Sequence, residues 1–136
     1  MEPRLKGMRI LVVDDNAINR KLAVTMLKRA GADVAAADSG EECLTIVNGD
    51  AFDLVLLDIE MPGLNGFETA RVIRAERSPE ELTILAFSAS LVMNMETRCT
   101  EAGMNGFLSK PIHMEALIST LERFGPRKRQ PPPPAI

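Results

Sequence analysis

Residues 52–66 read Phe-Asp-Leu-Val-Leu-Leu-Asp-Ile-Glu-Met-Pro-Gly-Leu-Asn-Gly, and this stretch decides the fold. The uninterrupted apolar run from Leu54 to Leu57 is typical of a strand that is covered on both faces in a parallel sheet. The run ends at the carboxylate of Asp58, and Met61-Pro62-Gly63 then breaks the chain into a loop. Asn65 can cap the helix that follows. Asp58 is therefore predicted at the carboxyl end of a central strand, where open α/β sheets bind their ligands.

Length and composition indicate one ordinary globular domain. The chain has 136 residues, of which 46% are hydrophobic and 26% are charged, and these values are typical of a domain with its own core. A formal net charge of -3 offers no basic surface for nucleic acid. The chain also has five Phe and no Trp or Tyr, which argues against a stacking platform for bases.

The sequence carries no targeting or membrane-spanning signal. No run approaches the roughly 18 consecutive apolar residues of a membrane helix, and the first seven residues lack the apolar centre of a signal peptide. Cys43 and Cys99 lie far apart without a CxxC pattern, so we interpret them as buried apolar groups in a reduced protein. We therefore expect a cytoplasmic protein that does not contact a membrane.

Apolar runs and turn residues alternate along the chain with a regular spacing. They predict strands at 8–13, 33–37, 54–57, 82–87 and 106–109. The helices between and after them are expected at about 17–30, 40–48, 66–77, 93–102 and 114–124. Five strands that alternate with five helices indicate an α/β fold with a parallel sheet and right-handed crossovers.

Three of the helices carry local signals. In the first, apolar residues recur at helical spacing; they are Ile18, Leu22, Met26 and Leu27. Ser39, followed by Glu42 three residues later, matches a capping box at the start of the second helix. In the last helix, the residues expected to face inward are Leu117, Ile118 and Leu121.

The two ends of the chain differ from its centre. Residues 1–7 are expected to form a loose leader before a domain at 8–124. Residues 125–136 contain the basic run Arg127-Lys128-Arg129 and four consecutive prolines. Such a segment cannot extend a helix and is expected to be disordered or polyproline in conformation. A linker is the favoured interpretation, with a ligand for a proline-binding groove as the alternative.

Polar residues end four of the predicted strands, and the carboxyl ends of parallel strands share one rim of the sheet. In chain order these residues are Asp14, Asp15, Asp58, Ser88 and Lys110. Each has an ordinary explanation alone, as a helix cap, a loop start or a solvated charge. Because those explanations do not account for all of them at one edge, we interpret the set as a functional site.

This set of groups suits phosphoryl transfer. Clustered carboxylates raise one another's pKa unless a cation lies between them, and oxygen ligands with open positions suit Mg²⁺. The backbone carbonyl of Glu60 could also reach that metal. Asp58 would be the nucleophile, Lys110 and Mg²⁺ would neutralise the phosphoryl oxygens, and Ser88 would donate a hydrogen bond. The single histidine, His113, is interpreted as a surface residue at a helix start.

Taken together, these motifs closely resemble the receiver domain of two-component response regulators, including the chemotaxis regulator. The resemblance covers about residues 8–124. It rests on Asp-Asp after the first strand, Asp-x-x-Met-Pro-x-x-x-Gly after the third, Ser-Ala after the fourth and Lys-Pro after the fifth. Leu-Val-Val-Asp-Asp-Asn and Asp-Ile-Glu-Met-Pro also look like the receivers of hybrid histidine kinases.

The resemblance implies a flavodoxin-like, doubly wound sheet in the order 2-1-3-4-5, with three helices on one face and two on the other. It implies Asp58 as the phosphoacceptor, with Ser88 and Lys110 binding the phosphoryl group. The implied Mg²⁺ ligands are Asp14, Asp15, Asp58 and the backbone carbonyl of Glu60. The peptide between Lys110 and Pro111 is expected to be cis.

The resemblance also implies how the domain signals. The donor would be a histidine kinase or a histidine phosphotransfer protein, and a downstream protein would read the fourth helix, fifth strand and fifth helix. Phe107 lies at the family's switch position, where its ring would fill space left by Ser88; the alternative is a plain core residue. The domain would be a signalling module whose only catalysis is its own phosphorylation and dephosphorylation, without direct contact to nucleic acid.

Two other functions compete with this one. A Mg²⁺-dependent phosphohydrolase also uses an aspartyl phosphate, but it needs a second Asp where this chain has Glu60. A receiver that has lost phosphorylation could serve only as a docking module. The sequence leaves open whether the chain acts alone or is part of a longer kinase, and it names neither donor nor output partner.

Overall fold

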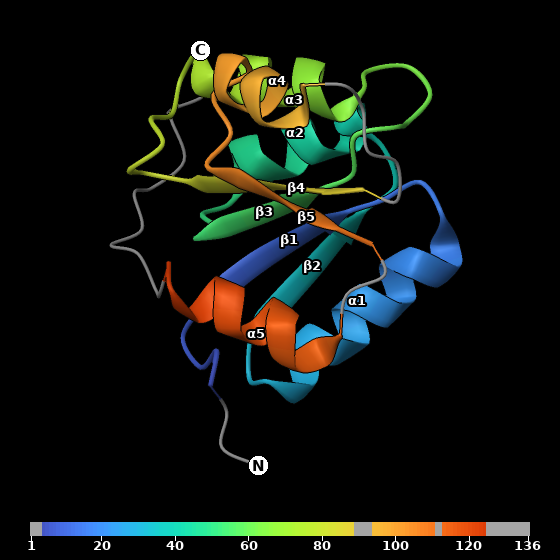
Figure 1. Ribbon diagram of the computed structural model, residues 1–136, viewed down its shortest axis with the longest axis vertical. Coiled ribbons are helices and arrows are strands. Elements are labelled where there is room, and N and C mark those ends of the chain that lie inside the picture. The colour runs from blue at the N-terminus through green and yellow to red at the C-terminus, as the bar shows by residue number, and fades with distance from the viewer. Residues whose placement is uncertain (1–3, 89–93, 111–112, 125–136) are drawn as a thin grey trace.

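A single parallel sheet organises the molecule. The computed structural model describes residues 4–88, 94–110 and 113–124. The strands are β1 (Arg9–Val13), β2 (Asp33–Ala37), β3 (Leu54–Leu57), β4 (Thr83–Ser88) and β5 (Gly106–Ser109), paired in the order β2-β1-β3-β4-β5 (Figure 1). This is the predicted strand order. The expected cis peptide at Pro111, the tail from residue 125 and the first three residues of the leader lie outside the described residues.

Helices cover both faces of the sheet. They are α1 (Ala17–Arg29), α2 (Gly40–Gly49), α3 (Gly66–Arg74), α4 (Met95–Glu101) and α5 (Met114–Glu122). Figure 1 shows α1 and α5 below the sheet and the other three helices above it. The flavodoxin-like, doubly wound arrangement is therefore confirmed. Within the described residues, no helix has both the length and the apolarity to cross a membrane.

The core divides into two apolar clusters, one on each face of the sheet. All four residues of β3 are buried, and Val55 and Leu57 belong to one cluster while Leu54 and Leu56 belong to the other. This is why the strand reads as a continuous apolar run. Cys43 and Cys99 are free and buried, as expected, and burial raises the pKa of the Cys43 thiol to about 12.

The apolar residues at helical spacing in α1 coincide only in part with its buried face. Ile18 and Leu22 are 79% and 59% exposed, although both belong to the apolar pattern. The buried stripe of α1 consists of Ala23 and Leu27, and Ala30 continues it just past the helix. Ala23 and Ala30 are smaller than Ile18 and Leu22, so part of the outward face carries more apolar bulk than these inward positions.

The leader also differs from the expectation of a loose segment. Leu5 is 1% exposed and packs in the same apolar cluster as the inward residues of α5. Its N–H donates to the carbonyl of Ala30 at 2.8 Å, and its own carbonyl accepts from Met8 at 3.0 Å. Because the Leu5 side chain is buried and both of its backbone polar groups are hydrogen-bonded, residues 4–7 form an ordered part of the domain.

Helix boundaries agree with the sequence within a few residues. α3 ends at Arg74 rather than near Arg77, because the residues after it form turns that the Arg74 guanidinium holds through the carbonyls of Arg77 and Ser78. α5 ends at Glu122, and Phe124 bonds to the carbonyl three residues back. Such tightening of a last turn is common at helix ends.

Side-chain caps fix where three helices begin. The Asn16 side chain accepts from two N–H groups at the start of α1. Asn65 forms a full capping box with Glu68 at the start of α3. Ser39 accepts from the N–H of Glu42, but the Glu42 carboxylate accepts from Asp38 rather than from Ser39. The box predicted for α2 is therefore only half formed.

Candidate functional site

The register of the sheet aligns the carboxyl ends of its central strands. Val13 of β1 pairs with Leu57 of β3, so the next residues, Asp14 and Asp58, both leave the sheet at the same rim. The N–H of Asp58 still donates to the carbonyl of Val13 at 2.9 Å. On the other side of β3, the N–H of Lys110 donates to the carbonyl of Ser88 at 2.9 Å. Backbone bonds therefore hold the predicted site residues at one edge.

Three carboxylates meet at this rim. One oxygen from each of Asp14, Asp15 and Asp58 lies within 4.8 Å of the others. Asp14 and Asp58 are buried and Asp15 is exposed, so the cluster opens to solvent on the Asp15 side. The N–H of Asn16 donates to Oδ1 of Asp14 at 2.9 Å, which orients that carboxylate. The structure thus brings together the three acids that the sequence placed in one site.

Lys110 supplies the positive charge of the cluster. Its Nζ lies 2.5 Å from Oδ2 of Asp14 and 3.9 Å from Oδ1 of Asp58. The side chain is largely buried, and its Nζ lies 5.2 Å from the centre of the Phe87 ring. Lys110 therefore favours Asp14 over the proposed nucleophile, and a small movement of its amine would carry it toward Asp58.

Burial raises the pKa of Asp58 above its ordinary value. Desolvation raises the pKa of Asp58 from 3.8 to about 6, the Lys110 charge opposes this rise, and the charges of Asp14 and Asp15 add to it. The neighbouring acids and the desolvation together make the free carboxylate costly. A cation between the three carboxylates would remove that cost.

The residues present fit a hard divalent cation. All three side chains offer oxygen, they lie close enough to share one ion, and the exposed side of the cluster leaves positions for water or phosphate oxygen. Glu60 is exposed two residues beyond Asp58. These features suit Mg²⁺, which keeps some of its waters and shares its ligands with phosphate groups.

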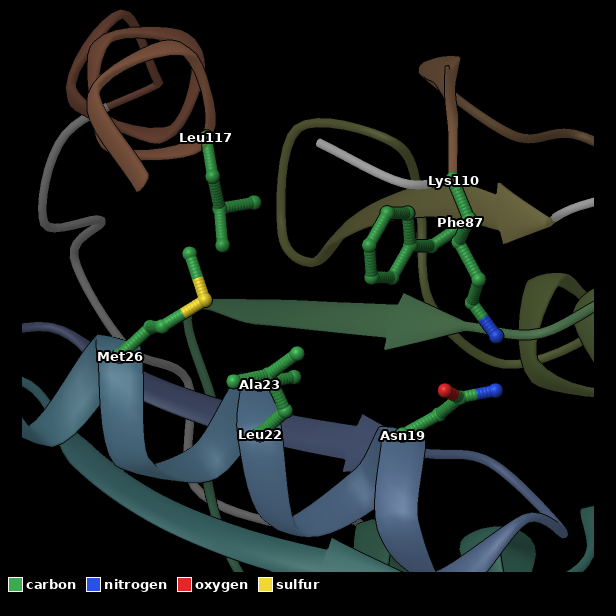
Figure 2. Close-up of a pocket in the computed structure, with 7 residues that line it drawn as sticks. All are labelled: Asn19, Leu22, Ala23, Met26, Phe87, Lys110 and Leu117. Carbon is green, nitrogen blue, oxygen red and sulfur yellow. The ribbon is translucent and has the colours of Figure 1, made fainter. Parts of the chain in front are cut away.

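A pocket of about 100 Å³ lies beside Lys110, between α1 and α5. Figure 2 shows Met26 and Leu117 at one end and the Lys110 amine near Asn19 at the other, with the Phe87 ring along the wall. The remaining lining residues, Leu22 and Ala23, come from α1. The stem of Lys110 thus follows an apolar wall that also contacts α5.

The other predicted site residues take distinct positions. Ser88 is buried at the end of β4. Phe107 on β5 is 38% exposed, so the alternative that it is a plain core residue is wrong. His113 is an exposed residue at the start of α5, as expected.

One residue near the site was missed by reading the sequence. Arg20 in the first turns of α1 donates from Nη1 to the carbonyl of Asp14 at 2.7 Å. It therefore holds the turn that carries two of the three acids. Its position one turn after the Asn16 cap was the available signal, but an arginine on a helix surface is ordinarily a solvated charge.

Comparison with known proteins places this geometry in a family. The family profile of the response regulator receiver domain matches residues 10–122. The virulence sensor protein BvgS of Bordetella bronchiseptica is 42% identical over 134 residues, which cover 95% of this chain and 11% of that protein. The sensor protein GacS of Pseudomonas syringae is 37% identical over 132 residues, covering 94% of this chain and 15% of that protein. The chain thus spans a small part of these relatives.

Solved structures agree with the relatives. The chemotaxis protein CheY4 of Vibrio cholerae superposes with a TM-score of 0.81 at 29% identity, covering 86% of this chain and 98% of that one. The receiver domain of the sensor histidine kinase PA1611 of Pseudomonas aeruginosa, solved with a magnesium ion in its active site cleft, gives 0.79 at 30% identity, covering 87% and 97%. With the matched profile and the acidic rim at the ends of β1 and β3, the chain belongs to the response regulator receiver domain family of two-component signalling.

Proposed function

We propose that this domain accepts a phosphoryl group on Asp58 from the phosphohistidine of a histidine kinase or a histidine phosphotransfer protein. The observation that carries the proposal is the convergence of Asp14, Asp15 and Asp58 with Lys110 at one rim, with Asp58 buried at the end of the central strand β3. Lys110, and a cation held by the three carboxylates, can neutralise the negative charge that develops on Asp58.

The transfer needs only a proton from solvent, and the later hydrolysis uses one water. An oxygen of Asp58 attacks phosphorus, the P–N bond of phosphohistidine breaks, and its electron pair stays on the imidazole nitrogen, which takes up a proton. Hydrolysis of the resulting acyl phosphate returns the free carboxylate. Held by Asp14, Asp15, Asp58 and the backbone carbonyl of Glu60, Mg²⁺ would supply positive charge to the phosphoryl oxygens.

Lys110 and Ser88 act on the phosphoryl group. The Lys110 amine, which contacts Asp14 at 2.5 Å, moves toward the new oxygens on Asp58, and Ser88 donates its hydroxyl to one of them. Movement of Ser88 leaves space on β4 that the exposed ring of Phe107 can enter, since Phe107 and Ala86 are paired residues of β5 and β4. The surface formed by α4, β5 and α5 changes as a result, and a downstream protein reads it.

The relatives support the identity of the donor. BvgS and GacS are sensor proteins, and the other matched relatives include histidine kinases of rice and Arabidopsis thaliana. A receiver that resembles domains of such proteins has a histidine as its natural phosphate source. The magnesium bound by the PA1611 receiver supports the choice of metal. The cytoplasmic location stays a prediction.

The proposal is tested by labelling with a small donor, so that no kinase has to be identified first. We expect the wild-type chain, with Mg²⁺ and radiolabelled phosphoramidate, to acquire an alkali-labile acyl phosphate. Asp58→Asn should acquire none. Asp38→Asn is the matched control, because Asp38 is an exposed aspartate just after β2 that lies outside the acidic cluster.

Four results would contradict the proposal. Label retained on Asp58→Asn would show that another residue is the acceptor. Labelling that does not depend on Mg²⁺ would exclude the metal from the reaction. A wild-type chain that neither binds Mg²⁺ nor takes up label would favour a domain that serves only for docking. Steady turnover of a simple phosphomonoester would favour the phosphohydrolase.

A further inference from the structure

The segment before β1 is fastened to α5 by one arginine. Arg4 donates from Nη1 to both carboxylate oxygens of Glu115 at 2.8 Å. Its Nη2 donates to the Ser119 hydroxyl at 3.2 Å and also contacts the Glu122 carboxylate. These three acceptors lie at positions i, i+4 and i+7 of α5, so they form a single stripe along the helix. Figure 1 shows the start of the described chain beside α5.

The contact is better built than an ordinary surface ion pair. Exposed pairs contribute little unless the geometry is ideal or several charges form a network, and Arg4 forms such a network with Glu115, Ser119 and Glu122. Its hydrogen bonds lower the pKa of Glu115 and of Glu122. Leu5, the next residue, is buried beside the inward residues of α5. Polar and apolar contacts thus hold the same segment, residues 4–7, which we call the strap.

The strap holds the first turn of α5, and that turn follows closely on the candidate site. Glu115 is the second residue of α5 and lies five residues after Lys110. Leu117 of α5 and Lys110 line the same pocket (Figure 2). The amine of Lys110 has to leave Asp14 to reach a phosphoryl group on Asp58. Because Glu115 lies only five residues after Lys110, a displacement of Lys110 is expected to be transmitted to the first turn of α5, which Arg4 contacts.

We propose that the strap is an intramolecular regulatory segment. It restrains α5 and thereby opposes the movement of α5 that accompanies phosphorylation of Asp58. This inference rests on the proposed function. A restraint that favours the observed position of α5 disfavours every other position. By thermodynamic reciprocity, release of the strap eases the switch, and the switch loosens the strap.

The first experiment tests the strap independently of any phosphorylation. Amide hydrogen exchange of Leu5 and Met8 is measured in the full chain for wild type, Arg4→Met and Lys6→Met. We expect exchange about tenfold faster in Arg4→Met, since a network of charge-assisted bonds is lost. Lys6→Met removes the same charge from an exposed position of the strap and should exchange like wild type. Unchanged exchange in Arg4→Met would show that Arg4 does not hold the strap.

The second experiment tests the coupling. The affinity for beryllofluoride, a mimic of the acyl phosphate, is measured by calorimetry in the presence of Mg²⁺ for the same three proteins. We expect Arg4→Met to bind about fivefold more tightly, at the low end of couplings between sites, and Lys6→Met to match wild type. An unchanged or weaker affinity in Arg4→Met overturns the coupling.

The two experiments distinguish failure of the proposed function from failure of the regulatory role of the strap. If the wild-type chain binds no beryllofluoride at all, the proposed phosphoacceptor function fails, while the exchange result on Leu5 still stands. If wild type and Arg4→Met bind equally, the function stands and the regulatory role of the strap fails. Arg4→Lys gives a further check, because it keeps the charge but replaces the two guanidinium nitrogens that reach Glu115, Ser119 and Glu122 with one ammonium, and should fall between the two.

Discussion

At the scale of single residues, the site carries more negative than positive charge: three carboxylates lie near one lysine. Asp58 is 7% exposed and lies among two further acids, while the nearby ammonium of Lys110 is engaged with Asp14. Desolvation and like charges both disfavour its ionised form, so the fold holds Asp58 at an energetic cost. A bound cation would lower the free energy of this ionised carboxylate. In our proposal, the acyl phosphate formed on Asp58 would also be bound to that cation.

That cost gives a pH dependence with a definite sign. Because the pKa of Asp58 is raised from 3.8 to about 6, the proton it keeps stabilises the fold at low pH, and this contribution is lost as pH rises through about 4 to 6. Without metal, Asp58→Asn should therefore be about 1–3 kcal/mol more stable than wild type near pH 8 and nearly equal to it near pH 3. Urea unfolding in EDTA at several pH values measures the difference.

The control for this pH experiment is Asp38→Asn, which should follow wild type at every pH. Adding Mg²⁺ should reduce the advantage of Asp58→Asn, since the ion compensates the wild-type carboxylate. An advantage that does not vary with pH would show that the substitution acts through packing rather than through charge.

At the scale of elements, close packing of α3 against the loop after β3 fixes the position of Asp58. A Cβ on Gly66 would collide with the carbonyl oxygen of Asp58 and lie 2.8 Å from Cα of Ile59. The N–H of Gly66 donates to the carbonyl of Ile59 at 2.9 Å. Glycine is therefore required at the start of α3 because the helix touches the backbone that carries the proposed nucleophile.

We expect Gly66→Ala to destabilise the domain by about 1–3 kcal/mol, as overpacking does, and to slow labelling of Asp58 because the loop must move. Gly49→Ala is the matched control: Gly49 ends α2, and a Cβ added there would meet no atom within 4 Å, so alanine should be neutral or slightly stabilising. Denaturant unfolding and phosphoramidate labelling of both variants decide the matter. Equal stability of the two variants would mean that the contact is not tight.

At the scale of the whole molecule, our proposal requires that a change at the site reaches α5 through the two strands β4 and β5. β4 ends at Ser88 and Lys110 follows the last residue of β5, so both lie at the rim, and the partly exposed Phe107 lies on β5 opposite Ala86. α5 follows directly, with Leu117 packed beside the pocket that contains the Lys110 stem. A change at Asp58 can therefore reach α5 through two adjacent strands and one short connection.

The chain has no Trp or Tyr, so Phe107→Trp introduces a unique fluorophore at the proposed switch. We expect its emission to move to shorter wavelength when Mg²⁺ and beryllofluoride are added, because the ring leaves a partly exposed position for a buried one. The double variant with Asp58→Asn should show no shift. Emission that is unchanged in the single variant, although beryllofluoride binds, would exclude Phe107 as the moving group.

The sequence by itself determined the order of strands and helices and the identity of the rim residues. Two local rules explain this success. A strand that is buried on both faces has an uninterrupted apolar sequence, as Leu54 to Leu57 does, and the carboxyl ends of parallel strands all lie at one edge of the sheet. The Asn65 cap and the inward face of α5 were readable for the same reason, because each depends only on neighbours along the helix.

The tertiary structure decided what depends on distant partners. Ile18 and Leu22 belong to the apolar pattern of α1 yet are exposed, whereas Ala23 and Leu27 are buried, because the tertiary packing of the helix decides which of its faces meets the sheet. The leader looked loose because its anchors, Ala30 and Glu115, lie far along the chain. The preference of Lys110 for Asp14 over Asp58 is likewise a matter of distances between side chains from opposite ends of the sequence, and no local pattern records it.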